Sequence, residues 1–466
     1  MYARVRDGFA ALFVPIACWQ LWLFPTVPNY YVQHALLYPC FCFWLYAWQS
    51  GHWREALQRW RWTFWFVVLV CLMQGYAQWT SAQYFVPEAS LQAAAFTWFK
   101  LLAQIPFLAF FFEILCLLVA TQRSRLYLLY GSICAFFALT ALCGVQALYI
   151  FTVQPTNNLS HWLQSWTSSF LLCCAPWVEA RWPASVYNLY QKGTYTLTTL
   201  RCNGFFEEAS ALAAVIGVFF VPLAIGLWQT GKRFQYKALL YMGRTVLIAC
   251  FFLLLASRCA TGVGLALLLL LYCGALWLRG LTWQKQSAVL LLMALCAVLT
   301  STAYTFKTGY SWNNFSRDKQ GRLAVTSLSV EIAHDFPLFG VGRGWFSAHC
   351  IQRTPHASAY GEEFRQWYTQ KSIPQLCALG AVLAEYGFII TALAFFAYIL
   401  LIRKIAAQWQ RKGGVYWHCL LYWSCSYGVF ASITALGSLD IRSPLFCLPL
   451  FFFCAALHNP SSQKMI

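Results

Sequence analysis

The chain has 466 residues, 60% of them hydrophobic and only 10% charged, and it carries a net charge of +18 at neutral pH. Soluble domains carry roughly 25% charged residues, so this composition excludes an ordinary soluble enzyme. The positive charge does not indicate a nucleic-acid partner, because the basic residues alternate with long apolar stretches instead of forming one patch.

Twelve apolar stretches follow one another along the chain. Each is long enough to cross a bilayer, whose lipid core of about 30 Å needs about 20 apolar residues in a helix. We predict an all-α, polytopic integral membrane protein that forms one membrane domain over residues 1–466. The predicted spans are 8–24, 31–49, 62–79, 97–120, 126–151, 205–229, 238–257, 261–279, 286–304, 375–402, 414–436 and 443–458.

The distribution of Lys and Arg predicts the orientation, because cytoplasmic loops retain basic residues. More than half of the 32 basic residues lie in one set of alternate segments, which includes both ends of the chain. The short loops of the other set hold only Arg258 and Arg442. Both termini are therefore predicted to be cytoplasmic, with two long loops, 152–203 and 303–374, facing outward from the plasma membrane. The first stretch lacks a small-residue cleavage site and is predicted to be a retained helix.

Both long loops are predicted to be structured, because neither is rich in Gly and Ser or in blocks of like charge. The first carries alternating aromatic and Thr residues over Tyr187–Thr199, a pattern that fits a short hairpin or an interfacial helix. The second contains an amphipathic stretch, Arg322–His334, and a helical pattern at Glu362–Tyr368.

Most of the 20 cysteines lie inside predicted spans, where a thiol behaves as a small hydrophobic group. No Cys or His cluster has the spacing of a metal site, so neither a metal nor a cofactor is predicted. Nothing in the sequence pairs the remaining outer-face cysteines, which are Cys173, Cys174, Cys202 and Cys350.

Ionisable side chains at the outer boundary are the first candidates for a functional site, since charged groups near lipid are costly. Arg201, Glu207 and Glu208 lie where the sixth span begins. A salt bridge would explain part of this cluster, but two adjacent acids exceed what one Arg needs. Repulsion between the two carboxylates would raise the proton affinity of one of them, which suits a general base.

Three further arginines are candidates for binding an anion. Arg258 lies in a short turn between two apolar spans, either as a snorkelling side chain or as a guanidinium placed for phosphate oxygens. Arg322 follows Gly321 in the second long loop. Arg343 lies within Gly-Val-Gly-Arg-Gly at 340–344, which predicts a tight turn that could bring N–H groups and a cation to a phosphate.

Asp335 precedes this turn, and His349 and His356 follow it. Each histidine is either a surface hydrogen-bonding residue or a candidate base. Glu385 lies in the tenth predicted span, where a buried carboxylate needs a partner. We predict that Glu385 belongs to a buried Arg–Glu pair that locks this helix to its neighbours, and that Asp335 has a supporting role.

Five short motifs occur in order along the second half of the chain. They are Arg-x-x-Gly-x-Phe-x-Glu-x-Ser at 201–210, Ser-Arg at 257–258, Gly-Arg at 321–322, Pro-Leu-Phe-Gly-Val-Gly-x-Gly at 337–344 and Leu-Ala-Glu-Tyr-Gly at 383–387. In this order they resemble the bacterial O-antigen polymerase and ligase superfamily, and most of all its branch of O-antigen and exopolysaccharide polymerases. The resemblance covers roughly residues 201–390, a family-like catalytic core, and the first five spans match only in hydrophobicity.

The resemblance implies a metal-independent glycosyltransferase on the periplasmic face of the bacterial inner membrane. Its donor and acceptor would be oligosaccharides linked to undecaprenyl pyrophosphate, and its further partners would be membrane lipids and a chain-length regulator protein. The anomeric carbon would be inverted. The pyrophosphate would be bound by Arg201, Arg258, Arg322 and Arg343, and the candidate bases are Glu208, Glu207 and His356.

The chain departs from the ligase pattern at one position. Ligases of the superfamily carry a His-Asn-like pair shortly before the Glu of Leu-Ala-Glu-x-Gly, and here that position is Leu376. A polymerase is therefore favoured over a ligase or a protein O-oligosaccharyltransferase, which stay as alternatives. A transporter or flippase of lipid-linked sugars is the rival from another class, although little charge lies at inner-leaflet depth.

Overall fold

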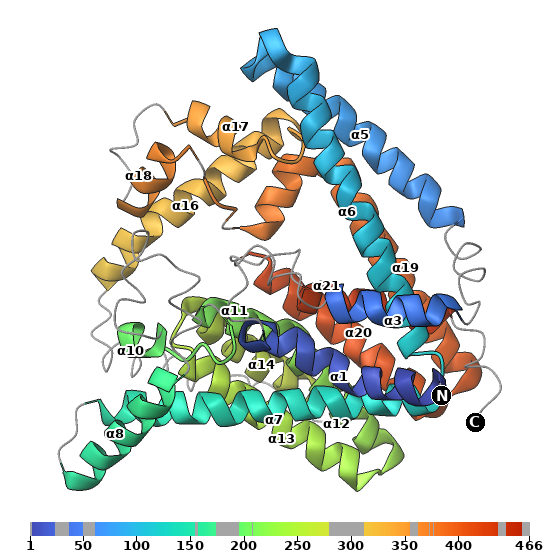
Figure 1. Cartoon of the computed structure of the whole chain (residues 1–466), viewed down its shortest axis with the longest axis vertical. Coiled ribbons are helices and arrows are strands. Elements are labelled where there is room, and N and C mark those ends of the chain that lie inside the picture. Colours follow the sequence, from blue (N-terminus) through green and yellow to red (C-terminus); the bar gives the residue numbers. More distant parts are fainter. Residues whose placement is uncertain are drawn as a thin grey trace.

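The computed structural model describes residues 2–23, 37–49, 61–153, 157–173, 195–206, 208–278, 312–354, 362–371, 373–375, 377–436 and 444–458. Within these ranges every regular element is a helix and no strand occurs (Figure 1). The all-helical prediction is thus confirmed for the described part of the chain. A helix suits such apolar segments because it satisfies its own backbone N–H and C=O groups.

The helices follow the predicted spans closely. Their bounds are α1 Tyr2–Leu23, α3 Leu37–Gln49, α5 Arg61–Phe85, η1 Pro87–Ala89, α6 Ser90–Leu118, α7 Gln122–Thr152, α8 Asn158–Cys173, α10 Tyr195–Thr199, α11 Ala209–Val215, η3 Ile216–Phe220, α12 Val221–Phe234, α13 Lys237–Ala256, α14 Ala260–Leu278, α16 Trp312–Asp335, α17 Phe346–Gln352, α18 Glu362–Thr369, α19 Ala378–Lys412, α20 Gly414–Thr434 and α21 Pro444–His458. Each predicted span overlaps a described helix except 286–304, which lies outside the described residues. The largest differences are that α6 begins at Ser90 and α19 ends at Lys412.

Five of the described helical segments are long and apolar enough to cross a membrane. They are Pro87–Leu118, Gln122–Thr152, Ala209–Phe234, Lys237–Ala256 and Ala378–Lys412. Shorter apolar helices occupy Ala260–Leu276 and Phe446–Leu457. The fold is therefore that of an all-helical protein with several helices that could cross a membrane, and the count of twelve spans stays a prediction.

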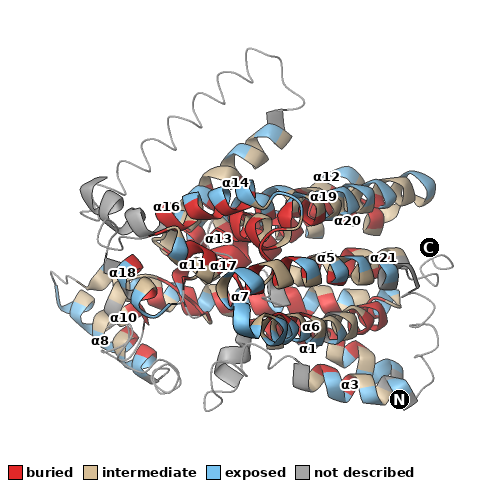
Figure 2. Ribbon diagram, turned by 90° about the horizontal axis from the view of Figure 1, so that it is seen from above, coloured by how far each residue is buried: buried red, intermediate tan, exposed pale blue. Residues whose placement is uncertain are grey.

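In the described part of the chain, the larger of two hydrophobic cores is built around the continuous helix Ala209–Phe234. Most residues of this helix are buried, and Phe219 and Phe220 pack against Trp423 of α20 and Phe136 of α7, respectively. Its middle turn, Ile216–Phe220, is a π-helix, so the backbone widens there. Buried residues lie toward the middle of the bundle and exposed ones on its outer faces (Figure 2).

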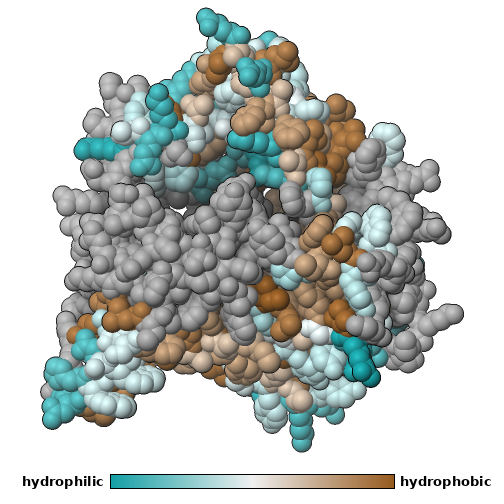
Figure 3. All heavy atoms as spheres, in the orientation of Figure 1, coloured by the Kyte–Doolittle hydropathy of each residue, from teal (hydrophilic) through white to brown (hydrophobic). Residues whose placement is uncertain are grey.

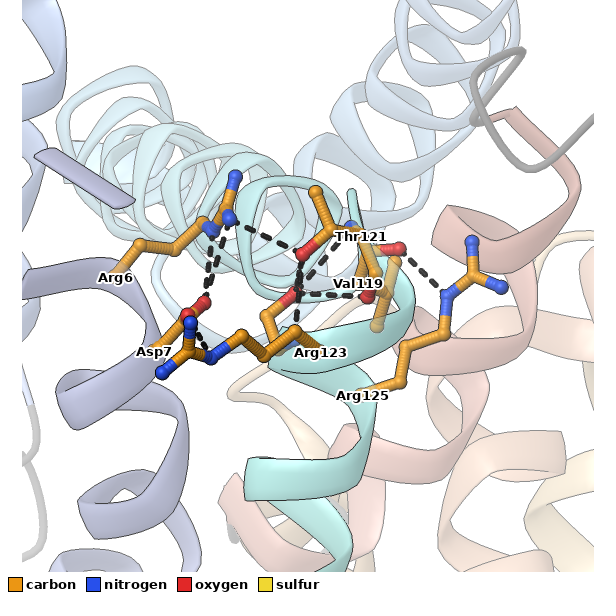
Figure 4. A network of polar contacts seen from close by, with 7 residues as sticks. Arg6, Asp7, Val119, Thr121, Arg123 and Arg125 are labelled. Carbon is orange, nitrogen blue, oxygen red and sulfur yellow. Dashed lines mark hydrogen bonds and ion pairs between the residues drawn. The ribbon is translucent and has the colours of Figure 1, made fainter. Parts of the chain in front are cut away.

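A polar network at one end of this bundle ties α1 to the turn between α6 and α7 (Figure 4). The buried Asp7 carboxylate accepts hydrogen bonds from Arg6 and forms an ion pair with Arg123 at 3.2 Å. Arg6 also donates to the Thr121 hydroxyl at 3.1 Å. Nearby, the Arg125 Nε donates to the Val119 carbonyl at 2.8 Å. These polar contacts thus stabilise the turn between α6 and α7, where the positive charges of Arg6, Arg123 and Arg125 would otherwise repel one another.

The smaller core joins the end of α5 and the start of α6 to α16, α17, α18 and the start of α19. In Figure 1 these elements form the upper part of the molecule, whereas α10 and α11 lie in its lower part. Its fully buried side chains include Val325, Ile332 and Phe364. The amphipathic stretch Arg322–His334 thereby forms the second half of α16, and its apolar face packs into this core.

The predicted loop elements are partly described. Glu362–Tyr368 is helical, as predicted, and forms most of α18. Of Tyr187–Thr199, only α10 lies within the described residues, and it is a helix. The first loop also contains α8, which was not predicted. Its exposed Trp162, Trp166 and Phe170 recur at helical spacing, which was the available signal.

Candidate functional site

The tenth predicted span is a broken helix. Within α19 the backbone of Gly387 has φ 72° and ψ 178°, so two helical pieces meet at this residue. The break falls in the Leu-Ala-Glu-Tyr-Gly motif at 383–387. A break frees backbone groups that must find new partners.

Those partners come from the glycine turn, which we define as residues 337–344. The Val341 N–H donates to the Ala384 carbonyl at 2.8 Å, and the Gly342 N–H donates to the Glu385 carbonyl at 3.0 Å. In the opposite direction, the Phe388 N–H donates to the Pro337 carbonyl at 2.6 Å. Two sequence motifs that are far apart in the chain therefore interlock through their backbones.

Glycine is required on both sides of this contact. Gly340 has φ +70°, and a Cβ there would lie 2.5 Å from the Glu385 carbonyl carbon. A Cβ on Gly387 would lie 2.4 Å from the Leu338 carbonyl oxygen. Both residues combine a left-handed φ with no room for a side chain. The tight turn predicted at 340–344 is confirmed.

Polar side chains of α5 and α19 hold the glycine turn through hydrogen bonds. The Gln74 Oε1 accepts from the Arg343 N–H at 3.0 Å, and its Nε2 donates to the Glu385 carbonyl at 3.1 Å. The buried Glu385 carboxylate accepts from the Gly344 N–H at 3.1 Å. Glu385 is thus buried as predicted, and this bond ties α19 to the turn. The Arg partner predicted for it stays a prediction.

Arg201 and Arg258, here called the arginine pair, belong to two neighbouring turns. The Arg258 Nη1 donates to the carbonyl of Leu200, the residue before Arg201, at 3.0 Å. Leu200 and Arg258 both have a positive φ, of 54° and 49°. Non-glycine residues rarely adopt this conformation, and such strain is concentrated at functional sites.

Glu208 lies just before α11, exposed to solvent, and its Oε2 accepts from the Ser210 hydroxyl at 3.0 Å. Tyr195 of α10 lies beside Arg201, Glu208 and Ala209. Burial raises the pKa of Tyr195, whereas the positive charge of Arg201 opposes this rise. Arg201, Arg258, Glu208 and Tyr195 therefore belong to one group at the start of the helix Ala209–Phe234.

A buried amide holds this group against α7. The Gln146 Oε1 accepts from the backbone N–H groups of Asn203 and Gly204 at 3.1 and 2.9 Å. Its Nε2 donates to the Asn203 Oδ1 at 3.0 Å. The Gln146 side chain therefore satisfies the backbone N–H groups that follow Arg201. The sequence analysis did not single out Gln146.

Replacing Gln146 with Leu should lower the free energy of unfolding by about 3 kcal/mol. The loss of three buried hydrogen bonds leaves two N–H groups unsatisfied, and each such group costs about 1–3 kcal/mol. Thermal unfolding of the purified protein in detergent measures the change. Gln122→Leu, at the first residue of the same helix, is the control and should leave the midpoint nearly unchanged.

The other predicted residues are placed as follows. Arg343 lies in the glycine turn, which bonds to α5 and α19, and Asp335 is the last residue of α16. For Arg322 only the helix position in α16 is described. Glu207, His356 and Leu376 lie outside the described residues. Convergence of the four arginines on one ligand stays a prediction.

Asp335 is the end of a chain of polar contacts that also contains residues the sequence did not single out. Its Oδ2 accepts from the Arg353 Nη2 at 2.7 Å, which lowers the pKa of Asp335. The Arg353 Nη1 lies 3.2 Å from the His349 Nδ1, and the His349 Nε2 lies 3.1 Å from the Ser81 Oγ. Ser81 donates to the Val341 carbonyl at 2.6 Å.

This chain fixes the tautomer of His349. A guanidinium can only donate, so Nδ1 accepts and Nε2 carries the hydrogen that it gives to Ser81. Since Ser81 in turn donates to Val341, the histidine does not withdraw the serine proton. The arrangement supports the glycine turn and does not form a nucleophile with its base.

Lowering the pH should destabilise this core through His349. Burial, together with the charge of Arg353, lowers the pKa of His349 to about 4. The unfolded chain takes up a proton near pH 6.5 and the folded chain does not, so stability falls as the pH drops from about 6.5 to about 4. Between pH 7 and pH 5 the loss should reach about 2 kcal/mol.

Thermal unfolding of wild type and His349→Gln at pH 7 and pH 5 measures this effect. The variant should lose less stability between the two values. Asp335 is ionised throughout this range because Arg353 lowers its pKa, so the difference reports on His349. Equal losses in the two proteins would contradict the assignment.

No group of three or more His, Cys, Asp or Glu side chains that could hold a metal occurs among the residues the structure describes. Cys202 and Cys350 are free and buried, and burial raises the pKa of each thiol to about 12. Reactive cysteines have lowered pKa values, so neither is suited to nucleophilic chemistry.

The fold and these two polar groups define an all-helical protein with helices that could cross a membrane and a broken helix at Gly387. Comparison of the chain with models of protein families and with curated proteins finds no match. Its function is therefore argued from the geometry of the described residues.

Proposed function

We propose that this protein is a membrane glycosyltransferase that polymerises oligosaccharide repeat units linked to undecaprenyl pyrophosphate. The observation that carries the proposal is the arginine pair at the start of the helix Ala209–Phe234. A hydrogen bond connects the turns that hold these two guanidinium groups, and a helix of 26 residues begins beside them. The start of a helix favours anions, and guanidinium groups match phosphate oxygens in geometry.

In the proposed reaction a hydroxyl of the acceptor sugar attacks the anomeric carbon of the donor. The bond from this carbon to the pyrophosphate oxygen breaks, the configuration inverts, and undecaprenyl pyrophosphate leaves with the bonding electron pair. The hydroxyl proton passes to a carboxylate. Glu208 is the first candidate for this base because it is exposed and lies beside the arginine pair. Glu207 and His356 are the alternatives.

The arginine pair would act by stabilising charge. As the pyrophosphate leaves, its negative charge grows, and cations already held in place stabilise it without reorganising. The strained backbone at Leu200 and Arg258 supports this role, since both turns are held in conformations that free chains avoid. Arg322 and Arg343 are further candidates for the same charge, and no metal or cofactor is required.

The proposed location is the inner membrane, with the arginine pair on the periplasmic side. Contacts between the ends of helices support this topology. Ser81, near the end of α5, lies 3.1 Å from the His349 Nε2, and the Leu379 N–H at the start of α19 donates to the carbonyl of Ala435 after α20. Lys and Arg counts assign all of these segments to the outer side. Arg6 and Thr121, which also contact each other, are both assigned to the inner side.

Purified protein in proteoliposomes tests the proposal. Supplied with undecaprenyl-pyrophosphate-linked repeat units and no energy source, it should yield longer glycans and release undecaprenyl pyrophosphate. Folded protein that does neither would overturn the proposal. Transfer to lipid A core, or to a protein hydroxyl, would instead indicate a ligase or a protein O-oligosaccharyltransferase.

The broken helix α19 favours a second candidate, a transporter of lipid-linked sugars. Transporters often bind substrate where a helix is interrupted, since freed backbone groups and helix ends face the ligand. In this protein, backbone groups freed by the break at Gly387 form hydrogen bonds with the glycine turn. This arrangement favours a rigid structural contact over a substrate site for transport. Movement of labelled lipid-linked sugar between leaflets, with no glycan lengthening, would favour the transporter.

A further inference from the structure

A pocket of about 390 Å³ opens between the end of α5, the residue after α16 and the C-terminal half of α17. Its lining residues are Thr80, Ser81, Tyr84, Phe336, His349, Gln352 and Arg353. Sites for small molecules have volumes of about 300–1,000 Å³, so this pocket could hold one or two rings. Hydrophilic atoms gather around α17 next to apolar surface over α5 (Figure 3).

Aromatic rings form the walls of this pocket. The Tyr84 ring is nearly parallel to the His349 ring, with an interplanar angle of 14° and 6.4 Å between centroids. Phe336 meets His349 edge to face at 5.1 Å. Tyr84 is 61% exposed, so most of its ring is open to a ligand. Such faces suit the apolar C–H face of a saturated ring.

Planar polar groups line the remaining surface. The Gln352 amide donates to the Tyr84 hydroxyl, which orients both groups at the rim. Arg353 is held by Asp335 and His349 and also lies over the Phe336 ring at 5.8 Å. These groups offer several hydrogen-bond donors and acceptors whose positions are already set.

The charge of the pocket favours a neutral ligand over an anion. The Arg353 guanidinium is compensated by the Asp335 carboxylate at 2.7 Å, and His349 is neutral because its Nδ1 accepts from Arg353. An anion would have to compete with Asp335 for the same guanidinium. A neutral ligand with many hydroxyl groups meets no such competition.

We propose that this pocket binds one neutral pyranose ring of a glycan. The apolar face of the sugar stacks on Tyr84, and its hydroxyl groups bond to Gln352 and Arg353. The site is separate from the arginine pair, and it would hold part of a glycan chain at a distance from the reacting carbon. The binding does not require that the protein forms glycosidic bonds.

Saturation-transfer NMR on the purified full-length protein tests this proposal, with the methyl pyranosides of glucose, galactose and N-acetylglucosamine as probes and methyl glucuronide as the charged counterpart. At least one neutral probe should bind, and Tyr84→Leu should weaken it about tenfold or more. Gln352→Ala should weaken it less. Tyr76→Leu is the matched control, because Tyr76 lies on the same helix with 60% exposure and should leave binding unchanged.

Three results would overturn the proposal: no neutral probe binds the wild type, Tyr84→Leu binds as the wild type does, or the glucuronide binds more tightly than every neutral probe. Near-UV circular dichroism confirms that each variant is folded. Failure here is distinct from failure of the proposed function, since the binding assay contains no lipid-linked donor. Glycan lengthening without pyranoside binding would reject the pocket and retain the enzyme.

Discussion

Replacing Gly387 with Ala should lower the free energy of unfolding by about 3 kcal/mol or more and abolish activity. Two effects add up: a conformation almost restricted to glycine, worth about 1–3 kcal/mol, and a Cβ placed 2.4 Å from the Leu338 carbonyl oxygen. Relief of that contact would separate the broken helix from the glycine turn. Thermal unfolding in detergent and glycan lengthening in proteoliposomes measure the two losses.

Gly413→Ala separates the effects. Gly413 also has a positive φ, of 60°, in a similar extended backbone, but a Cβ added to it would meet nothing within 4 Å. This variant should therefore show the conformational strain alone and keep its activity. If Gly387→Ala were no less stable than Gly413→Ala, the interlock would not be the support described above.

Replacing either member of the arginine pair with Ala should slow glycan lengthening by about 10²–10³-fold, as the loss of an oxyanion donor does in other enzymes. The loss should fall on kcat more than on KM, because the charge of the pyrophosphate grows as it leaves. Glu208→Gln should also lower kcat, while the near-identical shape of Gln preserves the contact with Ser210. Steady-state rates with lipid-linked donor measure these effects.

Controls are needed because Arg258 also supports the backbone of Leu200. Arg258→Lys keeps the charge and should retain part of the rate if charge is what matters. Arg411→Ala removes one exposed charge at the last turn of α19 and should leave the rate unchanged. Wild-type rates in folded Arg201→Ala and Arg258→Ala would contradict the role of the pair.

The helices could be predicted from the sequence because their cause is local. An apolar stretch of about 20 residues forms a helix in lipid regardless of its neighbours, so α7, α13 and α20 begin and end near the predicted residues. By contrast, α6 begins at Ser90 and α19 ends at Lys412, well outside their predicted spans, because a helix can continue beyond the apolar stretch. The glycine turn was also predictable, since only glycine tolerates its backbone. The break in α19 was less so, because a single Gly in an apolar stretch is compatible with a continuous helix.

The supporting side chains were not predicted, although a weak signal exists. Gln74, Gln78 and Ser81 recur at helical spacing and form a polar stripe in a largely apolar helix. The Gln78 Nε2 lies 3.5 Å from the carbonyl of Arg343, so it too contacts the glycine turn. Such a stripe implies a polar partner but cannot identify it. The partner, the glycine turn, lies more than 250 residues further along the chain.

The sequence by itself determined the all-helical fold, the apolar spans and the residues at which the backbone must turn, because these depend on lengths and on properties of single residues. Tertiary structure alone decided that the turns of Arg201 and Arg258 lie together, that the turn of Arg343 bonds to α5 and α19, and that Ser81, His349 and Arg353 line one pocket. Such contacts depend on how helices pack, and packing is set by side chains that are distant in sequence.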